Sequence, residues 1–520
     1  MKMHQRRQPV THLLLCPVAE DSGGSRLAGD HFDPDESYAY FGNGTQHCRH
    51  DFSVPMNPQL APRQLDDFDW PLAYGAEALL RRYIQAFLDR NTFACRLSNQ
   101  MRDRTGTDFY EWVDHFSLNP EHRDALLAVG LVPEIVDAPS GIEVYYHPKA
   151  MMPRVLVQNG GSEQDVPLNL AIRTESIIDF VARHNLGQEA DGRFGAGFRR
   201  VLVCDEAKHR FHAVERLGYR GFLRHPRTPE SVEAVIAVRE LWHARKRDFP
   251  EDADGVAHAF DVQRRVIDLV GPDVACDLFF CEERAYWEMR NRAGQIQKRR
   301  QDSLGLGWAN HDHHTFRSSR RFFVDLIQFF LQFGFKKRER YYAGAQAGWG
   351  AQILEHFNAG ITVFADVDLM PEETSVDFSV ERLRDGSRLS TVGLWCGLHG
   401  DSFLQAGMHH LEARFDFSLL REQLASAGIA TMKPFSDFAF LKQAFTEGER
   451  WPVNPERVRS LLARELITHQ QAEFFLGSGA VGSHLENLQR KGGFKGFNQK
   501  SVSVIIQATD PRKVESPAER

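Results

Sequence analysis

The sequence predicts an α+β protein in which two βαβββ modules form a metal-binding half-barrel, with a large α-helical insertion between them. Two stretches, 112–158 and 307–369, each show the order strand, helix, strand, strand, strand, as judged from alternating apolar residues and turn-forming Gly and Pro. Both stretches place a histidine in the first strand, just before the helix. The residues between them have helical periodicity.

The composition is that of an ordinary globular chain: 520 residues, 42% hydrophobic, with a formal net charge of −7. This charge gives no reason to expect nucleic acid or an anionic membrane as a partner, so we expect a small-molecule substrate. The seven cysteines are scattered and form no CxxC pair, which favours a reducing cytoplasm over a disulfide framework. No apolar run reaches the roughly 18 residues of a membrane span, and His12 and Pro17 interrupt the only signal-like stretch.

Five regions are expected along the chain. The first mixes Gly, Asp, Pro and His without lasting periodicity, which is typical of an irregular surface arm. The predicted regions are 1–66 for this arm, 67–206 for N-terminal helices and the first module, 207–304 for the helical insertion, 305–450 for the second module with a candidate metal glutamate, and 451–520 for a C-terminal helix, a Gly-rich loop and a strand.

The elements follow in order from local patterns. Helices are expected after Trp70 and around Thr92–Met101. The first module consists of WVDHFSL, PEHRDALLAVG, LVPEIVD, IEVYYH and PRVLVQ. The second consists of GWANHDHHTF, SRRFFVDLIQFFLQFG, FKKRERYYA, AQILEHF and GITVFADVDL. The glycine-rich AGAQAGWGAQ that spans two of these strands lacks GxGxxG order, so we interpret it as a hairpin or substrate-facing loop.

Capping signals place the remaining helices. Thr228 and Pro229 mark the start of the insertion, Gly271 ends the helix AHAFDVQRRVIDLVG, and DVACDLFFCEERAYWEMRNRAGQIQKRR continues as a long helix. Asn454 and Pro455 begin a helix over ERVRSLLARELITHQQAEFF. GSGAVGS then breaks the chain, and SVSVIIQAT is expected to be a final strand.

Histidines in the two first strands are the first candidates for chemistry. Imidazole suits iron, zinc, nickel or copper, although a single strand histidine such as His115 is more typical of a structural residue. Around His313, the segment His311–His314 contains three histidines and an aspartate. Because strand side chains alternate, His311 and His313 share one face while Asp312 and His314 share the other.

Glu412 is the third candidate, since it lies between Leu411 and Ala413 in an apolar strand. A single carboxylate there could equally be solvated or paired with a cation. Two histidines and one carboxylate on separate strands, however, form a facial triad, which leaves metal positions open for a chelating substrate and O₂. Other histidines are weaker or alternative candidate ligands, the last three in case the strand register is shifted: those of HCRH at 47–50, His147, His399, His409 and His410.

Three stretches resemble the 2-oxoadipate dioxygenase/decarboxylase (hydroxyglutarate synthase) family of the vicinal-oxygen-chelate superfamily. VDHFSL at 113–118 is similar to the strand of the family's first histidine, and HHTFR at 313–317 is similar to its His-x-Thr-x-Arg motif. MHHLEARF aligns Glu412 with the family's metal glutamate, and the likeness covers about 100–415. The resemblance implies one Fe(II) held by His115, His313 and Glu412, with other divalent metals as alternatives.

The resemblance also implies the reaction, an oxidative decarboxylation of a 2-oxo acid by O₂. Arg317 would bind a substrate carboxylate. Asn119 stands where the family commonly has an arginine that grips substrate, so the substrate is left open. Two alternatives also remain: a metal-dependent isomerase, lyase or glyoxalase-like enzyme that does not use O₂, and a metal-free small-molecule-binding protein on the same scaffold. The oligomeric state is not predicted.

Overall fold

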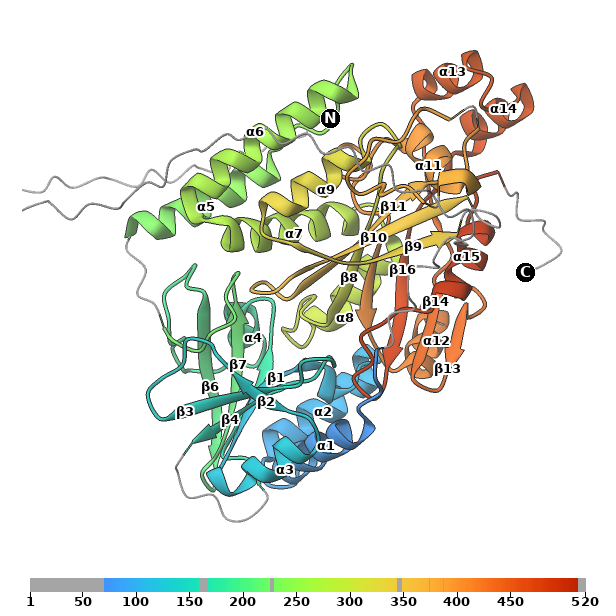
Figure 1. Cartoon of the computed structure of the whole chain (residues 1–520). Coiled ribbons are helices and arrows are strands. Elements are labelled where there is room, and N and C mark those ends of the chain that lie inside the picture. The colour runs from blue at the N-terminus through green and yellow to red at the C-terminus, as the bar shows by residue number, and fades with distance from the viewer. Residues whose placement is uncertain are drawn as a thin grey trace, which may run out of the picture. The chain divides into compact units, whose positions relative to one another are not determined.

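The computed structural model describes residues 70–158, 166–224, 229–343, 348–373, 375–386 and 388–512. The chain divides into Met1–Ala61 and Pro62–Arg520, and the description below concerns the second unit (Figure 1). The predicted arm at 1–66, the HCRH stretch and Thr228 lie outside the described residues. None of the described helices is long and apolar enough to cross a membrane.

The first module forms as predicted, within a seven-stranded sheet of order β2-β3-β4-β1-β5-β7-β6. Its elements are β1 (Val113–Leu118), α3 (Arg123–Ala128), β2 (Val132–Glu134), β3 (Ile142–Tyr146) and β4 (Arg154–Gln158). The helices α1 (Tyr74–Leu88) and α2 (Thr92–Thr105) precede it, and their apolar faces join one buried cluster with β1. This cluster anchors the first sheet.

A shorter βαββ module completes the first sheet. It consists of β5 (Asn169–Arg173), α4 (Ile177–Arg183), β6 (Phe198–Glu206) and β7 (His209–Arg216). Antiparallel pairing of β5 with β1 joins it to the first module. Strand β7 therefore belongs to this sheet, although the sequence boundary at 206 assigned it to the insertion.

The second predicted module also forms, in a nine-stranded sheet of order β13-β14-β16-β12-β8-β11-β10-β9 with β15 (Glu449–Trp451) paired to β16. Its elements are β8 (His311–Arg317), α9 (Phe323–Gln332), β9 (Lys336–Ala343), β10 (Trp349–His356) and β11 (Ile361–Asp368). A further module follows: β12 (His410–Arg414), α12 (Phe417–Ser426), β13 (Ser436–Phe438), β14 (Leu441–Phe445) and β16 (Ala480–Arg490). These two modules meet where β8 pairs antiparallel with β12.

The predicted fold class, α+β with paired modules and a half-barrel sheet, is confirmed. The pairing differs from the expectation, because the stretches 112–158 and 307–369 lie in different sheets and each pairs with the module that follows it. Residue alternation identifies strands and their buried faces, but it does not specify which strand becomes the neighbour in the sheet.

The helical insertion forms as α5 (Pro229–His243), α6 (Asp252–Val270), α7 (Pro272–Glu288) and α8 (Arg292–Asp302). Gly271 ends α6 with φ of 80°, as predicted. The predicted long helix is instead two, because the Asn291 side chain accepts a hydrogen bond from the Gly294 N–H and starts α8. Figure 1 shows α5, α6, α7 and α9 running alongside one another, and their aromatic residues share a buried cluster with β8 and β11.

The C-terminal region departs most from the sequence prediction. The expected single helix is α13 (Pro455–Ala463) followed by α14 (His469–Ser478). The Gly-rich break is shorter than expected, because β16 begins at Ala480. Within this strand Gly482 packs against Trp451, and a Cβ at Gly482 would lie 1.9 Å from the indole ring. Gly482 therefore permits a close contact within the sheet.

The predicted final strand at SVSVIIQAT is wrong, because these residues lie in α15 (Gln499–Ala508). Their β-branched residues favour a strand locally. In the folded chain, Val502, Ile505 and Ile506 lie at helical spacing and line the cavity of the second sheet. Burial of this apolar face outweighs the local preference.

The start of α14 provides a stability test. Thr468 and Gln471 form a capping box, in which the Thr468 side chain accepts from the Gln471 N–H and the Gln471 side chain accepts from the Thr468 N–H. We expect Thr468→Ala to lower the free energy of unfolding by about 1 kcal/mol, since the Gln471 N–H loses its acceptor. Urea unfolding measures this, with Gln470→Ala in the same exposed turn as the control; equal midpoints for both variants would contradict the expectation.

Candidate metal centre

One imidazole and two carboxylate side chains converge on one face of the second sheet. His313 on β8, Glu412 on β12 and Glu486 on β16 offer ligand atoms that all lie within 4.8 Å of one another. The strand register explains this, since His313 is opposite Glu412 and Glu412 is beside Glu486 on adjacent strands. All three are at most 3% exposed.

Glu412 is the centre of this cluster. Its Oε1 accepts a hydrogen bond from Thr315 Oγ1 at 2.8 Å and lies 3.2 Å from His313 Nε2. His410 Nε2 is 2.5 Å from the same oxygen. Glu412 Oε2 is buried and has no hydrogen-bond partner among the described residues. His410 therefore adds a second imidazole to the two carboxylates and His313.

The electrostatics of the cluster fit a bound cation. Burial, followed by the charge of Glu486, raises the pKa of Glu412 well above its ordinary value. Burial likewise raises the pKa of Glu486, against the hydrogen bond that it accepts from Gln443 Nε2 at 2.8 Å. Burial lowers the pKa of His313, which keeps its imidazole neutral as metal binding requires. Two adjacent buried carboxylates, one with an unpartnered oxygen, are the donor set that a divalent cation would satisfy.

His313 is held in a fixed orientation by Asp312 and Arg490. Asp312 Oδ1 lies 3.0 Å from His313 Nδ1, and Arg490 donates to both Asp312 oxygens at 2.9 and 3.0 Å. The Arg490 guanidinium and the His313 hydrogen bond hold the pKa of Asp312 far below its usual range, against burial. A carboxylate on Nδ1 leaves Nε2 as the ligand atom, an arrangement that typically supports metal-bound histidines.

Arg317 supplies a cation on the same strand. Alternation along β8 places it on the face of His313 and Thr315, where it is 2% exposed. Its Nε lies 3.8 Å from Asp366 Oδ2, while Nε and Nη1 have no hydrogen-bond partner among the described residues. Burial raises the pKa of Asp366 to about 7. Arg317 is therefore an incompletely paired cation beside the candidate ligands.

A cavity of about 30 Å³ adjoins these groups. Its apolar lining comes from β11, β14 and α15, and from two residues outside these elements, Phe435 just before β13 and Phe497 two residues before α15: Phe364, Phe435, Phe445, Phe497, Val502, Ile505 and Ile506. The helix therefore lines the site, and the cavity has room for about one water molecule.

The structure does not bring His115 or Asn119 to this cluster. His115 lies on β1 of the first sheet, where its Nδ1 is 2.6 Å from Asp114 Oδ1 and its ring packs against Phe222. Asn119 follows the same strand. Of the three ligands expected from sequence, His313 and Glu412 lie together and His115 lies in the other sheet, while Glu486 is the third member of the cluster.

The sequence contains a signal for Glu486 that strand patterns alone did not identify. The tripeptide His-Leu-Glu occurs at 410–412 and again at 484–486. In the parallel β12–β16 pair these tripeptides align residue by residue, His410 with His484 and Glu412 with Glu486. A search for short repeats would have found both carboxylates.

The alternative histidines have other positions. His399 Nε2 lies 3.1 Å from the Val481 carbonyl, and His409 Nδ1 lies 2.9 Å from the Gly482 carbonyl. His147 follows β3 and lines a different cavity. Among the alternatives that lie within the described residues, only His410 contacts a candidate ligand.

The second sheet consists of two βαβββ modules that form a half-barrel, and its strands β8, β12 and β16 carry the candidate ligands. No protein-family model and no curated protein sequence matches the chain.

Three solved structures show similarity at low overlap. A mutant of 4-hydroxymandelate synthase from Streptomyces coelicolor has 14% identity, with 76% of this chain and 97% of that chain covered and a TM-score of 0.27. Methylmalonyl-CoA epimerase from Mycobacterium tuberculosis has 12% identity, with 35% of this chain and 88% of that chain covered and a TM-score of 0.20. A xylose isomerase-like TIM barrel/4-hydroxyphenylpyruvate dioxygenase fusion protein has 10% identity, with 78% of this chain and 53% of that chain covered and a TM-score of 0.20. The fold assignment rests on the module topology and not on these scores.

The raised pKa of Glu486 predicts a pH dependence of stability. The folded state favours the protonated carboxyl, so its stabilising contribution is present below the ordinary value of 4.5 and is lost as the pH rises through the raised pKa. In metal-free protein, we expect the melting temperature of the wild type to fall relative to Glu486→Gln between pH 5 and 9. Added divalent metal should reverse this fall, since it binds the ionised form. Parallel pH profiles for the two proteins would refute the expectation.

Proposed function

We propose that the protein is a non-haem Fe(II)-dependent dioxygenase/decarboxylase that acts on a 2-oxo acid, with the metal held by His313, Glu412 and Glu486. The observation that carries the proposal is the convergence of these three side chains on adjacent strands, with one buried carboxylate oxygen unpartnered. His410 Nε2 lies 2.5 Å from Glu412 Oε1, and iron is favoured if His410 replaces Glu486 as the third ligand, since two imidazoles and one carboxylate form a facial triad.

Each surrounding residue has a defined task in this proposal. Fe(II), when bound, would polarise a chelated 2-oxo acid and keep positions open for O₂. Arg317 would bind a carboxylate of the substrate, since its guanidinium is buried and incompletely paired. Thr315 holds Glu412 through its hydroxyl, and Asp312 holds His313.

The hydrophobic cover would exclude water from the reaction. Phe364, Phe445 and Phe497 line the cavity beside His313. Asp366, with its pKa raised to about 7, can hold or release a proton next to Arg317 near neutral pH. A dry site strengthens the charge interactions of Arg317 with an anionic substrate.

Oxygen consumption tests the proposal. The full chain is reconstituted anaerobically with Fe(II) and then screened in an oxygen electrode with a panel of 2-oxo acids. We expect uptake with at least one member, matched by release of CO₂, and loss of most of this uptake in Arg317→Met. No uptake with any member would exclude the dioxygenase function.

A metal enzyme that does not use O₂ is the second candidate, as an isomerase, a lyase or a glyoxalase-like enzyme. The specific observation in its favour is the adjacent pair of carboxylates with raised pKa values. If His313, His410 and one glutamate hold the metal, the other glutamate is a buried general base. Conversion of a 2-oxo acid or related substrate without oxygen uptake would select this function. Absence of bound metal after purification without chelator would instead favour the metal-free binding protein.

A further inference from the structure

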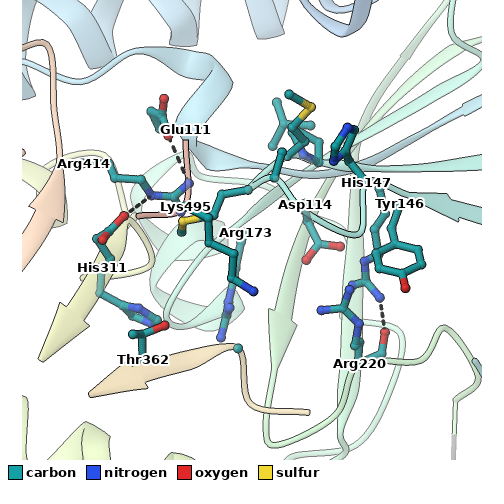
Figure 2. Close-up of a pocket in the computed structure, with 18 of the residues that line it drawn as sticks. Glu111, Asp114, Tyr146, His147, Arg173, Arg220, His311, Thr362, Arg414 and Lys495 are labelled. Atoms are coloured by element: carbon teal, nitrogen blue, oxygen red, sulfur yellow. Dashed lines mark hydrogen bonds and ion pairs between the residues drawn. The ribbon is translucent and has the colours of Figure 1, made fainter. Parts of the chain in front are cut away.

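A second cavity, of about 300 Å³, lies where residues from the two sheets come together (Figure 2). Its wall includes Asp114 of β1 and Arg173 of β5 from the first sheet, and His311 of β8 and Thr362 of β11 from the second. None of the three candidate metal ligands lines it. This cavity is therefore separate from the candidate metal centre.

Positive charge exceeds available negative charge in this lining. The cations are Arg154, Arg173, Arg220, Arg414 and Lys495, and the carboxylates are Glu111, Asp114, Asp312 and Glu355. Two of these carboxylates are already neutralised from outside the lining, Asp114 by Arg216 and Asp312 by Arg490, each through two hydrogen bonds. The remaining carboxylates are too few to neutralise the five cations.

Several of the cations have partners nearby. Arg414 Nη1 lies 3.0 Å from Glu111 Oε2, and Lys495 Nζ lies 2.7 Å from Glu355 Oε1. Arg220 pairs with Glu134, and Arg154 Nη1 lies 3.9 Å from the same carboxylate and donates to the Arg220 carbonyl. These pairs leave Arg173 as the cation to be explained.

Arg173 has no such partner. No carboxylate oxygen of the described residues lies within 4.0 Å of its guanidinium, and none of them forms a hydrogen bond with its side chain. Asp277 and Asp114 act on it only from a longer distance. Burial lowers the pKa of Arg173, which reflects the cost of removing an unpaired guanidinium from water. Figure 2 shows its side chain between the part of the wall that carries His311 and Arg414 and the part that carries Asp114 and Arg220.

His311 contributes a second unsatisfied group. Its Nδ1 is buried and has no hydrogen-bond partner among the described residues, and its side chain lines the same cavity. An imidazole N–H can donate one hydrogen bond to an oxyanion.

We propose that this cavity binds a small oxyanion, a carboxylate or a phosphate, with Arg173 as its counter-charge. A guanidinium offers two parallel N–H donors to either group. The volume is at the lower limit of small-molecule pockets, which are roughly 300–1,000 Å³, so a ligand of a few carbon atoms fits. The bound anion would neutralise Arg173 and the excess positive charge of the wall.

Calorimetric titration of the metal-free full chain tests the proposal. Inorganic phosphate and succinate are the two probes, and they distinguish a phosphate ligand from a dicarboxylate. We expect one saturable site for at least one probe in the wild type and in His313→Ala, because the metal ligand does not line the cavity. Arg173→Gln should weaken binding at least tenfold, whereas the control Arg102→Gln, on the exposed face of α2, should leave it unchanged.

Thermal unfolding provides a readout that does not depend on a tight complex. The binding probe should raise the melting temperature of the wild type and of Arg102→Gln but not of Arg173→Gln. Arg173→Gln should itself melt no lower than the wild type without anion, since it removes an unpaired charge. Binding of neither probe to the wild type, or equal binding by Arg173→Gln, would overturn the proposal. If the wild type binds the anion but shows no oxygen uptake, the result contradicts the proposed dioxygenase function and leaves the anion site supported.

Discussion

Replacing Glu412 by glutamine is expected to abolish stoichiometric metal binding, whereas replacing His115 by alanine is expected to leave it intact. Glutamine keeps the shape of Glu412 and an oxygen for Thr315 Oγ1, but it removes the charge that faces His313 and His410. Because loss of a supporting residue around a metal already costs about 10- to 100-fold in affinity, loss of a ligand should cost at least about 100-fold.

The measurement is metal content per chain after anaerobic reconstitution with Fe(II) and gel filtration. His115→Ala is the matched control, because it removes an imidazole from a corresponding first strand in the other sheet. Circular dichroism should show that both variants fold. Loss of metal from both variants would restore the ligand set expected from sequence, and full metal content in Glu412→Gln would reject Glu412 as a ligand.

Replacing Arg490 by methionine is expected to have the largest effect on stability. The Arg490 side chain, 4% exposed, donates two hydrogen bonds to Asp312, whose side chain is 2% exposed. Removal of one partner leaves a buried carboxylate uncompensated, which typically costs about 3–5 kcal/mol. Since Asp312 orients His313, metal affinity should also fall by about 10- to 100-fold.

Denaturant unfolding and metal titration of Arg490→Met measure the two effects. The double variant Arg490→Met with Asp312→Asn should recover much of the lost stability, because no uncompensated charge remains, but it should not recover metal affinity. Arg459→Met is the control, since Arg459 is exposed and lies 3.8 Å from an exposed glutamate. An effect of Arg490→Met no larger than that of the control would show that Asp312 does not depend on this arginine.

Sequence patterns predicted much of the candidate site. His313, Arg317 and Glu412 were identified from strand periodicity and from a family resemblance, and all three lie in or beside the buried cluster. His410 was named as an alternative ligand, and its Nε2 contacts Glu412. Glu486 was missed, because it lies in a strand that follows a Gly-rich segment interpreted as a chain break.

Two errors have the same physical origin. His115 was grouped with His313 because both precede a helix in similar modules, yet pairing of β1 with β5 and of β8 with β12 puts them in separate sheets. The segment of α15 was assigned to a strand because of its valines and isoleucines. Long-range packing decides both outcomes, and no local pattern encodes it.

By itself, the sequence determined the α+β class, the βαβββ order of two modules, the helical insertion and a candidate metal chemistry based on His313 and Glu412. The first three follow from the spacing of apolar residues and from capping residues, and the metal chemistry follows from the ligand preferences of imidazole and carboxylate together with the family resemblance that points to Glu412. Only the tertiary structure decided which modules share a sheet, and therefore that Glu486 rather than His115 lies beside Glu412. The reason is that strand neighbours are chosen by hydrogen bonding and burial between segments distant in sequence, here β12 and β16.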